Sequence, residues 1–100
     1  MILLVIEYDG TRYHGFQIQA NAPTIQGEVE RALFRLTGET IRIVGAGRTD
    51  AGVHAKGQVV GFNTRSTLPL ETFIRALNHY LPQDIVVSKA FRVAQDFDVR

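Results

Sequence analysis

Residues 1–10, MILLVIEYDG, form a short apolar run that is rich in branched side chains and closed by Asp9-Gly10. A run of this length, bounded by a turn signal, is typical of a buried β-strand. We therefore expect a strand from Ile2 to Tyr8.

Two amphipathic helices are expected further along the chain. The first follows Thr24, a suitable N-cap after Pro23, and ends near Gly38, where a glycine can terminate a helix. The second is opened by Pro69 and stopped by Pro82. Their apolar stripes are Ile25, Val29, Ala32, Leu33 and Leu36 in the first helix, and Leu70, Phe73, Ile74, Leu77 and Leu81 in the second.

Three further strands are expected over Thr40–Val44, Gln58–Thr64 and Ile85–Phe91. The order is then strand, helix, strand, strand, helix, strand (βαββαβ), which is the split βαβ, ferredoxin-like arrangement of α+β proteins. We expect an antiparallel four-stranded sheet with two helices on one face. The aromatic residues expected in the core are Tyr8, Phe73 and Phe91.

The composition is that of an ordinary globular domain. The chain has 100 residues, of which 45% are hydrophobic and 21% charged, and these values suit one modest core. No apolar run is long enough for a membrane helix, and no secretory signal is recognisable. Cysteine is absent, which excludes disulfides and thiolate metal sites. We expect a cytoplasmic protein without membrane contact.

The charge balance points only weakly to a nucleic-acid partner, because the formal net charge is +1. Most of the eleven cations are arginines, however, and arginine suits bidentate phosphate contact and stacking on bases. We expect Arg12, Arg42, Arg48 and Arg65 near one end of the molecule. A surface of scattered, solvated charges is the plainer interpretation.

The segment from Gly45 to Gln58, GAGRTDAGVHAKGQ, is expected to join the second and third strands as a charged loop. Its glycines permit sharp turns and a close approach of a large ligand to the backbone. Asp50 could act as a nucleophile, a general base or a metal ligand, or could simply cap a turn, as Asx residues often do. Arg48 favours a functional role, because it could keep the carboxylate ionised or contact a phosphate.

Residues 11–23, TRYHGFQIQANAP, form a second long polar connection, and long ordered connections tend to be functional. Tyr13 and Phe16 could stack on nucleobases, or could anchor the loop to the body of the protein. His14 and His54 could serve as acid and base, although exposed imidazoles are common in polar loops. His79 is explained by its place near a helix C-terminus.

The sequence offers little support for a metal or a cofactor. Asp50 and His54 are two possible ligands without a third, so we expect no metal site. The spacing of Gly45, Gly47 and Gly52 does not match a dinucleotide-binding loop, and there is no Gly-Lys-Ser/Thr run. We expect no cofactor.

Several blocks of the sequence resemble the tRNA pseudouridine synthase A family. Residues 47–55, GRTDAGVHA, are similar to the active-site motif of that family. The likeness extends through EYDGTRYHGFQIQ (7–19), TIQGEVERAL (24–33) and RALNHYLPQDIVV (75–87). The last residues, DFDVR (96–100), resemble a family segment usually read as Asp-Phe-His-Ala-Arg, so Asp98-Val99 replaces His-Ala. Phe16 stands where the family often has Trp.

The resemblance implies isomerisation of uridine to pseudouridine in the anticodon arm of tRNA, typically at positions 38 to 40. Asp50 matches the family's essential aspartate, and Arg48 matches an arginine thought to hold the flipped base out of the helix. Whether Asp50 attacks the ribose or the uracil, or takes a ribose proton, stays open. The segment from Tyr8 to Gln19 matches a loop that grips the RNA. The residues expected to bind RNA are Arg12, Tyr13, His14, Phe16, Gln17, Gln19 and His54.

The family's enzymes are longer and dimeric, with a second domain that supplies a tyrosine against the uracil and an arginine beside the aspartate. Residues 1–100 are therefore expected to be the N-terminal domain of a pseudouridine synthase, and inactive alone. A non-enzymatic RNA-binding module of ferredoxin-like fold is the main alternative. A small acyl-phosphate hydrolase would need a phosphate-binding loop after the first strand, and YDGTRYHG lacks that form.

Overall fold

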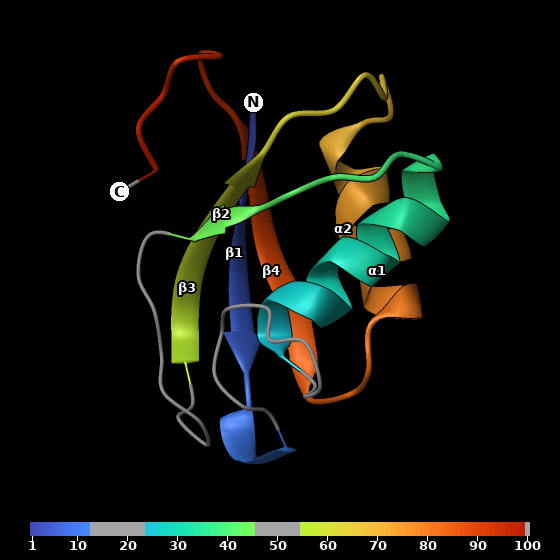
Figure 1. Ribbon diagram of the computed structural model, residues 1–100, viewed down its shortest axis with the longest axis vertical. Helices are drawn as coiled ribbons and strands as arrows, with labels where there is room; N and C mark the ends of the chain where they lie inside the picture. Colours follow the sequence, from blue (N-terminus) through green and yellow to red (C-terminus); the bar gives the residue numbers. More distant parts are fainter. Residues whose placement is uncertain (13–23, 46–54, 100) are drawn as a thin grey trace.

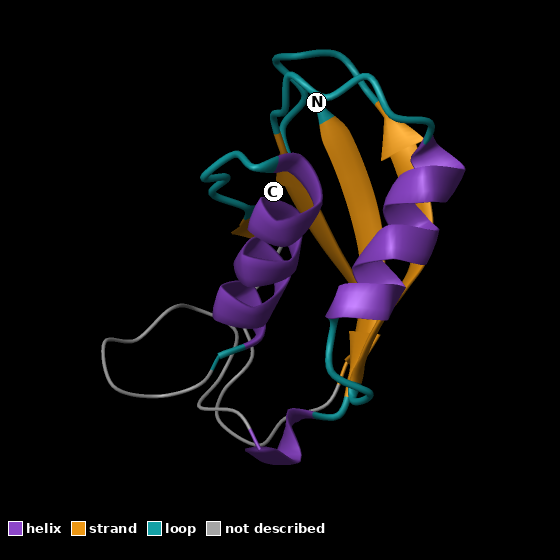
Figure 2. Cartoon of the chain, turned by 90° about the vertical axis from the view of Figure 1, so that its right-hand side faces the viewer, coloured by secondary structure: helices purple, strands orange, loops and turns teal. Residues whose placement is uncertain are grey.

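The computed structural model describes residues 1–12, 24–45 and 55–99. Its elements are β1 (Ile2–Tyr8), the 3-10 helix η1 (Gly10–Arg12), α1 (Ile25–Thr37), β2 (Val44–Gly45), β3 (Ala55–Phe62), α2 (Leu70–Tyr80) and β4 (Ile85–Arg92). The strands form one sheet in the order β2-β3-β1-β4, and each neighbouring pair is antiparallel. Both helices cover the same face of this sheet (Figures 1 and 2). The predicted ferredoxin-like α+β fold is confirmed.

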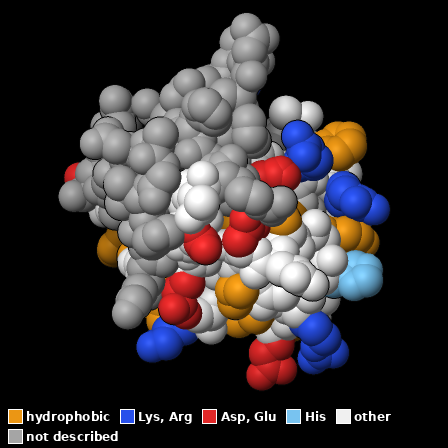
Figure 3. All heavy atoms as spheres, turned by 90° about the horizontal axis from the view of Figure 1, so that it is seen from below, with side chains coloured by type: hydrophobic (Ala, Val, Ile, Leu, Met, Phe, Trp, Pro, Cys, Tyr) orange, Lys and Arg blue, Asp and Glu red, His pale blue; other side chains and the backbone are white. Residues whose placement is uncertain are grey.

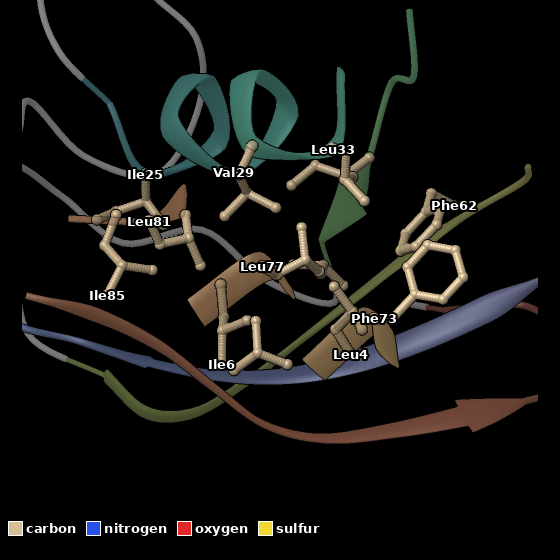
Figure 4. Close-up of a cluster of buried hydrophobic side chains, with 14 of the residues drawn as sticks. Leu4, Ile6, Ile25, Val29, Leu33, Phe62, Phe73, Leu77, Leu81 and Ile85 are labelled. Carbon is tan, nitrogen blue, oxygen red and sulfur yellow. The ribbon is translucent and has the colours of Figure 1, made fainter. Parts of the chain in front are cut away.

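The core lies between the helices and the sheet (Figure 4). Every second residue of β1 from Ile2 to Tyr8 faces the helices, as the two-residue period of a strand requires. The rings of Phe62 on β3 and Phe73 on α2 pack with their centroids 6.1 Å apart. The predicted burial of Tyr8 and Phe73 is therefore confirmed.

The expectation that Phe91 lies in the core is wrong, because its side chain is 48% exposed. The reason is a bulge between β1 and β4. Val87 pairs with Ile6 but Lys89 pairs with Val5, so β4 contains one extra residue at this point. One extra residue reverses the alternation of side chains, and Phe91 then lies opposite Leu3 on the face that the helices leave open.

The ends of the helices follow their predicted signals. The hydroxyl oxygen of Thr24 accepts a hydrogen bond from the backbone N–H of Gly27 at 3.1 Å, so Thr24 is the N-cap of α1. Gly38 has φ 77° and donates its N–H to the carbonyl oxygen of Phe34. Pro69 directly precedes α2, which ends before Pro82.

The second strand is much shorter than the predicted Thr40–Val44. β2 consists of Val44 and Gly45, which pair with Gly61 and Val60. The backbone N–H of Ile43 donates instead to the carboxylate of Glu30 on α1, at 2.9 Å. The chain before β2 is thus bonded to a helix, and it cannot pair with β3 there.

Neither α1, with 13 residues, nor α2, with 11, has the length and apolar character of a membrane-crossing helix, and these are the helices searched in the described parts of the chain.

Candidate functional site

Three strand ends meet at Tyr8. This last residue of β1 pairs with Ala55 at the start of β3 and with Ile85 at the start of β4. Residues 46–54 end where β3 begins, at Ala55. Residues 13–23 begin after η1, which directly follows β1. Both long segments singled out in the sequence are therefore attached at the same end of the sheet.

The predicted site residues lie mostly outside the described residues. This applies to Arg48, Asp50 and His54 in one segment, and to Tyr13, His14, Phe16, Gln17 and Gln19 in the other. Arg12 is the last residue of η1. The structure therefore describes the frame that carries these segments, and the roles of their residues stay predictions.

Asp9 holds the chain where it leaves β1. Its Oδ1 atom accepts hydrogen bonds from the backbone N–H of Thr11 at 3.0 Å and from the Thr11 hydroxyl at 2.6 Å. Its own backbone N–H donates to the carbonyl oxygen of Asp84, just before β4, at 2.9 Å. The sequence predicts Asp9-Gly10 as the turn signal that closes the first strand. The hydrogen bonds from Thr11 to Asp9 are those of an Asx residue in a turn, which agrees with that prediction.

Glu30 fixes the backbone that leads into β2 and then into residues 46–54. Its Oε2 atom accepts from the N–H of Ile43 and from the side-chain amide of Gln26, each at 2.9 Å. The guanidinium of Arg42 lies 3.5 Å from the other carboxylate oxygen. Glu30 thereby sets the path of the chain into β2, after which residue 46 follows. Periodicity alone did not distinguish this glutamate from the other polar residues of α1.

Of the four arginines expected at one end of the molecule, Arg48 lies outside the described residues, and the other three do not lie together. Arg65 follows β3, at the opposite end of that strand from Ala55, and its Nε lies 3.4 Å from the carboxylate of Glu39. Arg42 is paired with Glu30. Arg12 ends η1, which follows directly after β1.

The surface at this end carries mixed charge. Figure 3 looks onto it from below and shows acidic side chains beside the grey residues, with Lys and Arg farther out. Asp9 and Asp84 are at this end. Within residues 1–12, 24–45 and 55–99, no cluster of three or more His, Asp or Glu could hold a metal ion.

Comparison with known proteins connects this frame with one enzyme family. The family described as tRNA pseudouridine synthase matches residues 4–100. A protein of Syntrophomonas wolfei named tRNA pseudouridine synthase A is 54% identical over 99 residues, which are 99% of this chain and 40% of the relative. Proteins of the same name from Acetivibrio thermocellus and Moorella thermoacetica are 52% and 54% identical, over 99% and 97% of this chain.

This chain spans about 40% of the length of these relatives, since the matches cover 40%, 41% and 40% of them. The family match itself covers nearly all of the chain and includes the segment from Gly45 to Gln58. The chain belongs to the tRNA pseudouridine synthase family.

Proposed function

We propose that this chain supplies the aspartate-bearing half of the active site of a tRNA pseudouridine synthase that acts on uridines 38 to 40 of the anticodon arm. The observation that carries the proposal is the family match over residues 4–100, which spans the GRTDAGVHA motif. The other half of the site would come from a second domain, consistent with the greater length of the relatives. We propose residues 1–100 as the N-terminal domain of that enzyme.

The proposed reaction changes one bond to the ribose without changing the atomic composition of the nucleoside. The bond between C1′ and N1 breaks, the uracil turns, and C5 bonds to C1′. C5 then loses its proton and N1 gains one. Ionised Asp50 would serve as the nucleophile, and the bond that it forms to the ribose or the uracil would break again before the product leaves, so that the carboxylate is regenerated. The site would exclude water, because water would capture an activated sugar. No external redox partner or group donor is needed.

The target base must leave the helix before this chemistry can take place, at a cost of about a few kcal/mol. Arg48, two residues before Asp50, would fill the vacated space and keep the base out. The RNA on either side would be held by Arg12, Tyr13, His14, Phe16, Gln17, Gln19 and His54.

The described frame supports this division of labour. Tyr8 joins the ends of three strands, and the segments that carry Asp50 and the RNA-gripping residues are both attached there. Asp9 fixes the start of one segment, and Glu30 fixes the approach to the other. Sites carried by a rigid frame keep reacting groups in position better than free loops do. One RNA could therefore meet both segments together.

The rival role as a simple RNA-binding module is less well supported. Such modules present exposed aromatic rings on their central strands. On the central strands β1 and β3, the aromatic residues are Tyr8 and Phe62, and both are buried. The exposed Phe91 is on the edge strand β4. Within the described strands, the sheet therefore lacks the stacking platform that a module needs.

Tritium release from an anticodon-arm RNA labelled at uracil C5 tests the proposal, because C5 loses its hydrogen only if the new bond forms. We expect release by a protein that continues past Arg100 to the length of the relatives, without added cofactor. We expect this longer protein to be a homodimer in the cytoplasm. We expect no release from the 100-residue chain alone. RNA retention without tritium release by the longer protein would instead identify a binding module, and release by the short chain would contradict the shared site.

A further inference from the structure

The segment after β4 folds back onto the face of the sheet that the helices leave open. Val93 donates its backbone N–H to the carbonyl oxygen of Met1 at 3.0 Å, and the amino group of Met1 approaches the Val93 carbonyl oxygen at 3.3 Å. A further turn bond runs from the N–H of Phe97 to the carbonyl oxygen of Ala94 at 3.0 Å. We call residues 93–99 the return segment; it is the red trace above and beside the sheet in Figure 1.

The return segment meets the sheet at Gly61 of β3. Gly61 pairs with Leu3, whereas the next pair, Val60 with Leu4, faces the core, so Gly61 and Leu3 face the open side. A Cβ atom at position 61 would lie 2.6 Å from Cγ2 of Val99 and 3.1 Å from Cδ2 of Leu3. Val99 therefore occupies the space that any side chain at position 61 would need.

Gly57 provides an internal comparison on the same strand. It lies four residues before Gly61, between Gln58 and Ala55, where the pairing of β3 with β1 shifts register. A Cβ atom at Gly57 would meet no described heavy atom within 4 Å. The close approach at Gly61 is therefore specific to the place where the return segment crosses.

We propose that the absence of a side chain at Gly61 creates the space into which the Val99 side chain packs, and we call this contact the seat of Val99. The contact would direct the chain from the first domain toward the half of the active site that the second domain supplies. The inference rests on the proposed function. β3 begins directly after the segment that carries Asp50 and holds Gly61 near its other end. The same strand thus positions the aspartate segment and the exit of the chain. Gly61 is a positioning residue, without contact to the reacting atoms.

A side chain at position 61 should move the return segment and not the sheet, because β3 is held more firmly than the return segment. Gly61 is paired with Leu3 on one side and with Val44 on the other, so β3 is held within the sheet. Val99 has a short, β-branched side chain with one rotatable bond, and it cannot fold away as Leu3 could. A methyl group at position 61 therefore displaces the return segment and leaves the sheet in place.

A double-mutant cycle tests the seat itself, with Gly61→Ala, Val99→Ala, the double variant and Gly57→Ala as control. The measurement is hydrogen exchange at the Val93 and Phe97 amides in the 100-residue chain. We expect Gly61→Ala to speed exchange about tenfold with Val99 present and less than about twofold with alanine at position 99. Gly57→Ala is expected to change nothing. Equal effects of Gly61→Ala in both backgrounds, or equal behaviour of the two glycine variants, would overturn the seat.

Gly61→Ala, Val99→Ala and the double variant, made in a protein of the relatives' length, test the positioning role. Misplacing reacting groups by about an ångström can cost about 100-fold in rate. We therefore expect Gly61→Ala to lower kcat about 10- to 100-fold with KM for tRNA nearly unchanged, and Val99→Ala to restore part of the loss. Normal kcat despite fast exchange in Gly61→Ala would overturn the positioning role.

Failure of the proposed function can be told apart from failure of the Val99 contact. A wild-type protein that makes no pseudouridine would refute the proposed function, while the double-mutant cycle measured by hydrogen exchange would still test the seat. Should Gly61→Ala fail to fold, Val99→Leu enlarges the same contact from the return segment and leaves β3 intact. Faster exchange in Val99→Leu would support the seat, and unchanged exchange would overturn it.

Discussion

Asn78 holds both backbone groups of Val87. Its side-chain nitrogen donates to the Val87 carbonyl oxygen at 2.9 Å, and its side-chain oxygen accepts from the Val87 N–H at 2.7 Å. β4 is an edge strand of the sheet, and exposed edges invite pairing with other chains. The amide of Asn78 takes the place of a neighbouring strand at this point and ties α2 to the sheet.

Asn78→Ala should lower the free energy of unfolding by about 1–3 kcal/mol, because Val87 is only 1% exposed and its polar groups would lose their partner. The higher helix propensity of alanine offsets about half a kcal/mol of that loss. Urea unfolding of the 100-residue chain measures the change. Arg75→Ala, at an exposed position of the same helix, is the matched control, and an equal loss in both variants would contradict the role of the amide.

Gly38→Ala should cost about 1 kcal/mol of stability, because Gly38 ends α1 with φ 77°. A Cβ atom there would meet no described atom within 4 Å, so the cost is conformational and not steric. Asparagine tolerates this left-handed conformation better than alanine. Thermal unfolding should therefore rank the glycine protein first, Gly38→Asn second and Gly38→Ala last. Alanine ranking above asparagine would show that the left-handed backbone is not the source of the cost.

Glu39 should make the stability of the domain sensitive to acid. The Thr64 hydroxyl and the backbone N–H of Arg65 donate to its carboxylate and hold its pKa below the ordinary value of 4.5. A lowered pKa stabilises the folded state above about pH 4.5, and this contribution is lost as the pH falls through the folded-state pKa.

Glu39→Gln removes this ionisation and should flatten the fall in melting temperature between about pH 5 and about pH 3. Thr64→Val removes the main donor and should have the same effect in smaller measure. Melting temperatures measured across that range decide the matter. A Glu39→Gln protein that loses stability with acid as steeply as the unmodified chain would show that another group governs the response.

The sequence predicts the fold well wherever the signal is local. Thr24 and Gly38 mark the ends of α1, because the cap hydrogen bond and the left-handed backbone depend on single residue types. The predicted strand over Thr40–Val44 was too long, because the N–H of Ile43 bonds to Glu30, thirteen residues earlier. Phe91 was misplaced because nothing in the spacing of apolar residues announces a bulge. Both errors depend on contacts between distant segments.

Some residues of the candidate site can be recognised from the sequence, and others only from the folded structure. The motif around Asp50 is recognisable in the sequence because GRTDAGVHA resembles the active-site motif of the family in residue types and order. Glu30 and Gly61 are not recognisable in this way, because they are ordinary residue types whose partners depend on the fold, and Asp9 is recognisable only as part of the Asp9-Gly10 turn signal. Asp9 accepts from Thr11, Glu30 accepts from Ile43, and Gly61 leaves room for Val99. Only the folded arrangement identifies these partners.

Asp50→Asn should abolish pseudouridine formation by a protein of the relatives' length while leaving tRNA affinity within about threefold of the original. The amide has nearly the same shape as the carboxylate but is a far weaker nucleophile and base, so the chemical step is lost and the binding contacts remain. Tritium release and filter binding measure the two quantities separately. Arg48→Lys keeps the charge but loses the planar guanidinium, and should impair turnover less than Asp50→Asn does. Substantial tritium release by Asp50→Asn would remove Asp50 from the reaction.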